Sequence, residues 1–129
     1  MKRNVMAACL ALLAVSVAHA SKEAKPFAIA ADEFLSTELP LMDSAVQADD
    51  SKYFGEAYAR MMALISQYGA KIETAPRCAD AVIAMIVAGI CRTPTPDKQC
   101  EDPAFLPRFA SNVEQCKQAA NAVAPEGPR

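Results

Sequence analysis

Histidine is nearly absent from this sequence, and the position of the single histidine determines which functions can be excluded. His19 is the single histidine among 129 residues, and it lies in a segment that the sequence predicts to be removed. Without histidine, the remaining chain cannot form a Ser-His-Asp or Cys-His catalytic arrangement. It also lacks the ligand that zinc, copper and haem sites commonly use. We therefore expect no enzyme activity, no metal site and no bound cofactor.

Glycine is scarce, and so are long apolar stretches. The four glycines are far apart, so they cannot form a Gly-rich loop that binds phosphate groups. The most extended apolar stretch, residues 5–17, is shorter than the ~20 residues that a helix needs to span a bilayer. We therefore expect no stable insertion of the chain into a membrane.

The first 20 residues have the order of a secretory signal peptide. Lys2 and Arg3 form a positive start, residues 5–17 form the apolar part, and residues 18–20 match the small-x-small cleavage pattern. A buried first helix of the domain is the competing interpretation. We predict a cleavable signal peptide over residues 1–20 and export to the periplasm, with the extracellular space as the alternative.

The chain that remains after cleavage is acidic. Lys2 and Arg3 leave with the signal peptide, so 11 of the 13 basic residues remain against 15 acidic residues, a net charge of −4. A surface that binds nucleic acid needs basic side chains to neutralise the phosphates. The charge balance therefore argues against nucleic acid as the partner.

Residues 31–124 carry a 3.6-residue apolar period, which predicts an all-α domain of four or five helices. Residues 21–30 are predicted to be a flexible arm, and residues 125–129 a disordered tail. Pro40 interrupts the first helical segment, which is therefore either kinked or divided into two short helices. The helical segments are expected over residues 31–46, 51–71, 76–91 and about 102–124.

The second and third segments have the strongest patterns. The second has cap candidates at residues 49–51, and its predicted apolar stripe is Phe54, Tyr58, Met61, Met62, Ile65, Tyr68 and Ile72. Its polar face carries Lys52, Glu56, Arg60 and Gln67. Residues 82–91 contain no polar side chain, which predicts a central helix buried on most sides, capped by Thr74. A β-strand is the alternative there, because several of these residues are β-branched.

Four cysteines remain after cleavage, and they are predicted to form two disulfides. Cys78 and Cys91 lie on one predicted helix and are ~20 Å apart, too far to bond. The short connection that follows makes the third and fourth helices antiparallel, so Cys116 comes level with Cys78 and Cys100 comes close to Cys91. We therefore predict the pairs Cys78–Cys116 and Cys91–Cys100. A metal site of four cysteines is disfavoured, because no CxxC pair is present.

The connection between the third and fourth helices is the predicted protein-binding surface. It is polar, rich in proline and closed by a predicted disulfide, so it would bind a partner with little loss of conformational entropy. A plain surface connection is the alternative interpretation. The predicted binding residues are Arg92, Thr93, Thr95, Asp97, Lys98, Gln99 and Glu101.

Four acidic residues have both a catalytic and a structural interpretation. Glu33, Glu38 and Asp43 could supply the two carboxylates of a glycosidase, although acids on a solvated helix face are far commoner. Asp80 could be a buried acid with a chemical task, or it could interact with the free amides of the first helical turn. We favour the structural interpretation for all four.

Together these patterns favour a protein that binds and inhibits another protein. In general plan the exported, helical, disulfide-bonded chain resembles the small immunity proteins that protect bacteria from type VI secretion effectors, a likeness of fold alone. The resemblance implies that the chain neutralises a secreted toxin. One alternative is a periplasmic acid-stress chaperone that uses its carboxylates as the switch. The other is a carrier of a small apolar ligand lined by Met61, Met62 and Met85, which are more commonly core residues.

Overall fold

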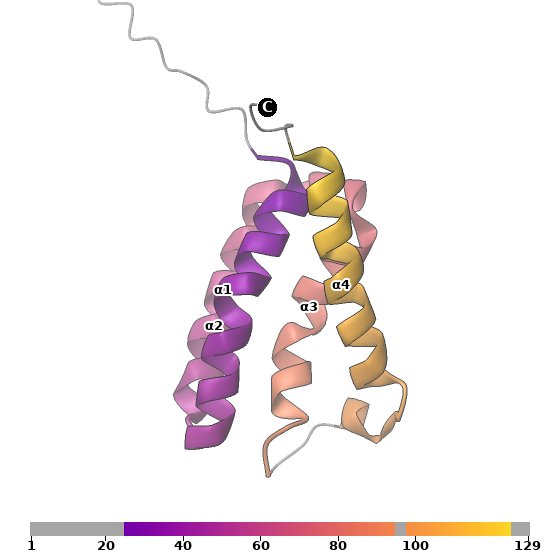
Figure 1. Cartoon of the computed structure of the whole chain (residues 1–129). Helices are drawn as coiled ribbons and strands as arrows, with labels where there is room; N and C mark the ends of the chain where they lie inside the picture. Colours follow the sequence, from indigo (N-terminus) through magenta and orange to yellow (C-terminus); the bar gives the residue numbers. More distant parts are fainter. Residues whose placement is uncertain (1–24, 95–97, 125–129) are drawn as a thin grey trace, which may run out of the picture.

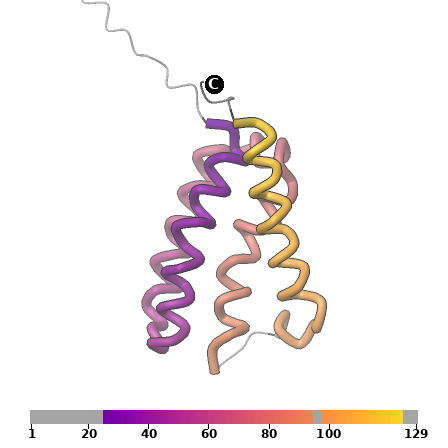
Figure 2. Tube along the Cα trace, viewed as in Figure 1, coloured from indigo at the N-terminus to yellow at the C-terminus, as the bar shows by residue number. Residues whose placement is uncertain are grey.

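The computed structural model describes residues 25–94 and 98–124, which form an antiparallel bundle of four α-helices (Figure 1). The elements are α1 (Phe27–Ala48), α2 (Ser51–Tyr68), η1 (Gly69–Thr74), α3 (Pro76–Ile90), η2 (Lys98–Glu101) and α4 (Phe105–Val123), where η marks a short 3-10 helix. No strand occurs in the described ranges, and the predicted all-α fold is confirmed. The start of α1 and the end of α4 lie at the same end of the bundle (Figure 2). The predicted signal peptide and tail, residues 1–20 and 125–129, lie outside the described residues.

Helix α1 begins earlier than the sequence predicted, within the range assigned to a flexible arm. It starts at Phe27, directly after Pro26, whose carbonyl accepts two amide hydrogen bonds at 3.0 and 3.2 Å. The Phe27 side chain is buried, and its ring centroid lies 5.3 Å from that of Tyr68 at the end of α2. Burial against a distant part of the chain orders this turn, and such a contact leaves no local period in the sequence.

Pro40 does not divide α1 into two helices. The helix runs through Pro40 as a single element of 22 residues. Proline lacks the amide hydrogen that would bond to the carbonyl of Ser36. Both residues lie on the exposed side of α1, where water can bind that carbonyl instead, so the helix continues.

The ends of α2 are set by local interactions. Asp50 is its N-cap, as expected, and its side chain accepts a hydrogen bond from the amide of Lys52 at 3.2 Å. The helix ends at Tyr68 rather than at residue 71. Gly69 follows with a φ of 52°, a left-handed conformation that glycine adopts without steric cost and that stops the helix.

Helix α2 packs through most of the predicted stripe, because Met61 and Tyr68 are buried and Phe54 and Ile65 lie partly buried against the core. Tyr58 and Met62 are exposed, whereas the buried residues of α2 are Tyr53, Ala57, Met61 and Tyr68. The small side chain of Ala57 allows α2 to lie close to its neighbours, and the hydroxyl of Tyr53 finds a buried partner. The buried face of α2 is therefore turned away from Tyr58 and Met62 and toward Tyr53 and Ala57. The sequence did not show this because large apolar residues lie on both sides of the helix.

Helix α3 packs against α1, α2 and α4, but one side of it reaches the surface. Ile83 is exposed, so the prediction that α3 is buried on most sides was too strong. A bundle of only four helices is too small to enclose one of them completely. Thr74 does not cap α3 either, because its hydroxyl donates to the carbonyl of Lys71 at 2.7 Å, and Ala75 is the N-cap residue. Met85 of α3, like Met61, belongs to the core.

Both predicted disulfides are confirmed. Cys78 of α3 bonds to Cys116 of α4, with their Cα atoms 4.5 Å apart, and both residues are fully buried. Cys91 bonds to Cys100 across the α3–α4 connection, with a Cα separation of 5.3 Å. The first disulfide therefore joins two helices within the core, and the second closes a surface loop.

Gly89 of α3 allows the side chains of α1 and α2 to pack directly on the helix backbone. A Cβ atom at this position would lie 2.9 Å from Cγ of Met42 and 2.7 Å from Cε1 of Phe54. We expect Gly89→Val to lower the free energy of unfolding by about 2 kcal/mol through overpacking, measured by urea denaturation. The control is Gly55→Ala, where an added Cβ meets nothing and better helix propensity stabilises the protein by about 0.5–1 kcal/mol. Equal stability of Gly89→Val and the wild type would contradict this packing.

Candidate functional site

The predicted protein-binding loop lies at the end of the bundle opposite the start of α1 (Figure 1). Arg92 pairs with Asp43 of α1, with 2.5 Å between Nη1 and Oδ1. The hydroxyl of Thr93 donates to the last carbonyl of α3 at 2.7 Å. The start of the loop is therefore held on the bundle by an ion pair as well as by the Cys91–Cys100 disulfide.

Two of the seven predicted binding residues of the loop fall outside the ranges that the structure describes. Thr95 and Asp97 lie outside the described residues. The remaining predicted binding residues are exposed on η2: Lys98, Gln99 and Glu101. Protein binding by this loop stays a prediction.

A local hydrogen-bond network joins η2 to α4. The carboxylate of Asp102 accepts a hydrogen bond from the amide of Ala104 at 2.9 Å and another from Arg108 at 3.2 Å. These bonds, the one from the amide foremost, hold the pKa of Asp102 below its usual value. The loop therefore enters α4 through a fixed turn.

The exposed acids are distributed among separate ion pairs. Glu33 pairs with Lys25 at 2.9 Å, and Asp43 pairs with the loop. Asp80 is exposed and lies 3.6 Å from Arg77, so it is not a buried acid, but α3 begins at Pro76 and has no acid in its first turn, so the predicted interaction with the first-turn amides was also wrong. Within the described ranges, no group of three or more His, Cys, Asp or Glu side chains could hold a metal ion.

Glu38 is different, because it is a carboxylate buried in the middle of α1. Its side chain is 3 % exposed. Arg60 of α2 donates from Nε to Oε1 at 2.5 Å and from Nη2 to Oε2 at 2.9 Å. The hydroxyl of Tyr53 donates to Oε2 at 2.8 Å, and the Arg60 guanidinium lies 5.8 Å from the centre of the Tyr53 ring. These three residues, the Glu38 cluster, fasten α1 to α2.

The three members of the Glu38 cluster perturb one another's pKa values. The hydrogen bonds from Arg60 hold the pKa of Glu38 below its usual 4.5, against the upward effect of burial. Burial, and then the bond to Glu38, raise the pKa of Tyr53, and the bond to Glu38 raises the pKa of Arg60. At neutral pH the cluster is therefore a carboxylate, a guanidinium and a neutral phenol. None of them changes its charge near pH 7, as general acid–base catalysis there would require.

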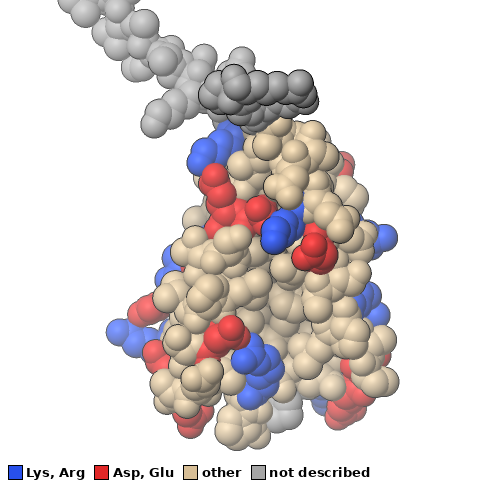
Figure 3. Space-filling view, viewed as in Figure 1, with Lys and Arg blue, Asp and Glu red and all other residues tan. Residues whose placement is uncertain are grey.

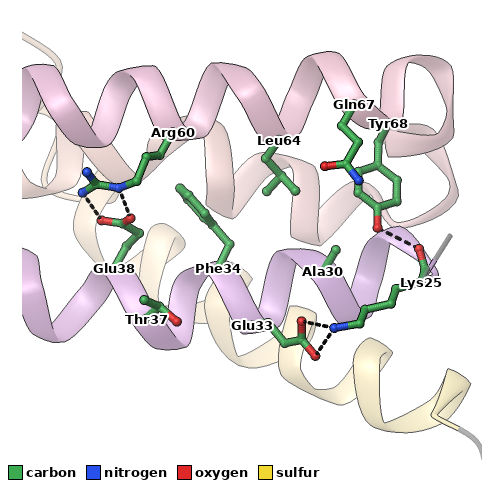
Figure 4. A pocket seen from close by; sticks show the side chains of 10 residues that line it. All are labelled: Lys25, Ala30, Glu33, Phe34, Thr37, Glu38, Arg60, Leu64, Gln67 and Tyr68. Carbon is green, nitrogen blue, oxygen red and sulfur yellow. Dashed lines mark hydrogen bonds and ion pairs between the residues drawn. The ribbon is translucent and has the colours of Figure 1, made fainter. Parts of the chain in front are cut away.

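A groove of about 980 Å³ runs from the Glu38 cluster toward the start of α1, between α1 and α2 (Figure 4). Phe34 of α1 and Leu64 of α2 point into it from opposite walls (Figure 4). At the far end, the hydroxyl of Tyr68 donates to the carbonyl of Lys25 at 2.8 Å. The groove is lined by Lys25, Ala30, Glu33, Phe34, Thr37, Glu38, Arg60, Leu64, Gln67 and Tyr68.

Arg60 is the member of the Glu38 cluster that reaches solvent. Its side chain is 44 % exposed, although Nε and Nη2 are both bonded to the buried carboxylate. Nη1 makes no hydrogen bond to any other described residue. The structure therefore holds a guanidinium in one orientation beside an apolar groove, with donors left for a second molecule.

The sequence pattern predicts Arg60 on the polar face of α2 and does not single out Tyr53, and the expectation of Glu38 on a solvated face was wrong. A signal for Glu38 was nevertheless present, because its position fits the spacing of the buried residues of α1. These alternate steps of four and three: Ala31, Leu35, Glu38, Met42 and Ala45. That alternation marks the buried side of a helix, so Glu38 could have been recognised as an acid on the core face.

The face of the bundle over α1 and α4 carries both signs of charge, with acidic and basic side chains interspersed among uncharged ones (Figure 3). Within the described residues, no helix has the length and apolar character needed to cross a membrane. This face therefore offers short-range pairing of individual charges rather than a field of one sign.

Comparison with known proteins adds no relative from which a role could be transferred. No protein-family model, curated protein or solved structure matches this chain. Its function is therefore inferred from the groove, the loop and the two disulfides.

Proposed function

We propose that this protein is exported and inhibits another protein by binding it, in the manner of an immunity protein against a secreted toxin. The observation that carries the proposal is the orientation of Arg60 by a buried carboxylate beside the apolar groove. Arginine is prominent among the side chains that dominate the binding energy of protein interfaces. Since Glu38 orients Arg60 before a partner arrives, binding costs little side-chain entropy.

The disulfides support export to an oxidising compartment. Disulfides persist in the periplasm and outside the cell, and they are rare in the cytosol. Residues 1–20 have the order of a secretory signal peptide, and the chain that follows carries an excess of acidic residues. We place the protein in the periplasm, with the extracellular space as the alternative. The loop that carries Arg92 and Thr93 is a second candidate contact surface.

A periplasmic acid-stress chaperone is the second candidate function, and the burial of Glu38 favours it. Protonation of Glu38 removes the charge that Arg60 and Tyr53 bind, which weakens the contact between α1 and α2. Separation of these helices would expose apolar side chains at low pH. A far-ultraviolet circular dichroism spectrum that is unchanged down to pH 2, without binding of a hydrophobic dye, would exclude this function.

The inhibitory function is tested by competition between the parent strain, with its secretion systems active, and a strain that lacks this gene. We expect the deletion strain to be killed and the wild-type gene to restore its survival. Leu64→Lys, which places a cation in the groove, should restore little survival. The matched control is Ile83→Lys, which places the same cation on the exposed side of α3 and should restore survival fully. Equal survival of parent and deletion strains would contradict the inhibitory function.

A further inference from the structure

The walls of the α1–α2 groove offer no free backbone edge to a partner. Both walls are α-helices, whose interior amides and carbonyls are bonded within each helix, except for the carbonyl of Ser36 one turn before Pro40. A partner strand therefore cannot extend a sheet here, which is the way extended peptides commonly gain affinity. The occupant has to interact through side chains while its own backbone hydrogen bonds are satisfied internally. An α-helix meets that requirement.

The positions along the groove follow the repeat of its two helices. Because α1 and α2 are antiparallel, residues of the two helices face one another in pairs at three levels along the groove. The pairs are Ala30 with Tyr68, Phe34 with Leu64 and Glu38 with Arg60. At 1.5 Å per residue the three levels extend over ~12 Å, so a helix of about three turns covers them. An occupant helix therefore meets an apolar level first and the guanidinium one turn later.

The two ends of the groove present different charges. At one end Lys25 and Glu33 are both more than half exposed, so both signs are accessible. At the other end Glu38 is buried and Arg60 is not, so a partner meets only the guanidinium. Glu56, one turn earlier on α2, is already paired within the helix at 3.5 Å. The accessible charge at the Arg60 end of the groove is therefore positive.

We propose that the α1–α2 groove docks an amphipathic helix of the partner protein, which packs apolar side chains on Phe34 and Leu64 and directs an Asp or Glu at Arg60. The inference rests on the inhibitory function proposed above and names the element that the groove recognises. The carboxylate lies three or four positions from the apolar residues in the partner helix, because the guanidinium lies one helical turn beyond Phe34. An arginine with its orientation already set binds a carboxylate through directional, charge-assisted hydrogen bonds.

Photocrosslinking in the periplasm of the source strain tests where the partner docks. Benzoylphenylalanine is introduced at Leu64 in the groove, at Lys98 in the loop or at Ile83 on α3. We expect a crosslink from Leu64, and its partner peptide should lie in a helix with an acid one turn from an apolar pair. A crosslink from Lys98 or Ile83 alone, or from Leu64 to a second copy of this chain, overturns the docking site but leaves the inhibitory function standing. No crosslink at any position contradicts both.

A synthetic peptide of the crosslinked segment then tests the role of Arg60. The variant is Arg60→Lys, which keeps a cation for Glu38 but loses the planar guanidinium edge. We expect this change, or replacement of the peptide's acid by its amide, to raise Kd by ten- to a hundredfold. Both changes together should raise Kd no further than one alone, since they remove the same contact. If the two changes together raise Kd by the product of their separate effects, the assignment of the peptide's acid to Arg60 is wrong. Circular dichroism verifies that the Arg60→Lys variant is folded.

Discussion

Loss of the Cys78–Cys116 disulfide is expected to lower the free energy of unfolding by about 4 kcal/mol. The change is the double variant Cys78→Ala/Cys116→Ala. A disulfide between residues 38 positions apart restricts the unfolded chain, and the chain-entropy relation assigns about 4 kcal/mol to a loop of that length. Both side chains are fully buried, so the lost sulfur atoms also leave a small cavity in the core.

This loss is a large part of the stability that a domain of this size has. Domains are typically stable by about 5–15 kcal/mol, so a loss of about 4 kcal/mol removes a quarter or more of that stability. Urea denaturation and thermal circular dichroism measure the effect. The matched control is Cys91→Ala/Cys100→Ala, which opens a loop with a separation of 9 residues and should cost about 2.7 kcal/mol. Equal or reversed losses for the two variants would contradict this account.

Replacement of Glu38 by glutamine is expected to cost about 2 kcal/mol at pH 7. Glutamine has the same shape and can still accept the Tyr53 hydrogen bond, but Arg60 loses its counter-charge. Breaking a buried ion pair by removal of one partner costs about 3–5 kcal/mol, and the exposure of Arg60 reduces that figure here. The control is Glu33→Gln, which removes one partner of an exposed pair and should change stability by less than about 0.5 kcal/mol.

The pH dependence of the same variant follows from the pKa of Glu38. The folded protein holds this pKa below 4.5, so the carboxyl group of the unfolded chain binds a proton at a higher pH than that of the folded chain. The contribution of Glu38 is therefore complete above pH 4.5 and is lost as the pH falls through the folded pKa. We expect the urea stability curves of wild type and Glu38→Gln to converge in acid. Curves that stay parallel from pH 7 to pH 3 would show that the charge of Glu38 does not stabilise the fold.

The fold could be predicted largely because its main determinants are local or short in range. Asp50 begins α2 through a hydrogen bond to the second residue after it, and Gly69 ends that helix through its own conformation. The disulfide pairs followed from two features. The rise along α3 keeps Cys78 and Cys91 too far apart to bond, and the short connection between α3 and α4 brings each of them close to a cysteine that follows. In each case the controlling interaction lies within a few residues or a single helical length, so the sequence pattern contains it.

The candidate site could be predicted only in part. Acids along α1 were recognised as candidates, but the burial of Glu38 depends on Arg60 and Tyr53, which lie 22 and 15 positions away. The spacing of the buried residues of α1 assigns Glu38 to the core face, but it does not show which side chains of α2 pair with it. The start of α1 was missed for a similar reason, because Phe27 is ordered by its contact with Tyr68 across the bundle.

The sequence by itself determined that the domain is a helical bundle, which cysteines pair and that residues 21–129 contain no histidine. These properties depend on composition, period and the fixed geometry of a helix. Only the tertiary structure decided which face of α2 is buried and that Glu38 and Arg60 meet beside an apolar groove. Those outcomes depend on how side chains from separate helices fit together, and packing of this kind is set by the whole bundle rather than by any one segment.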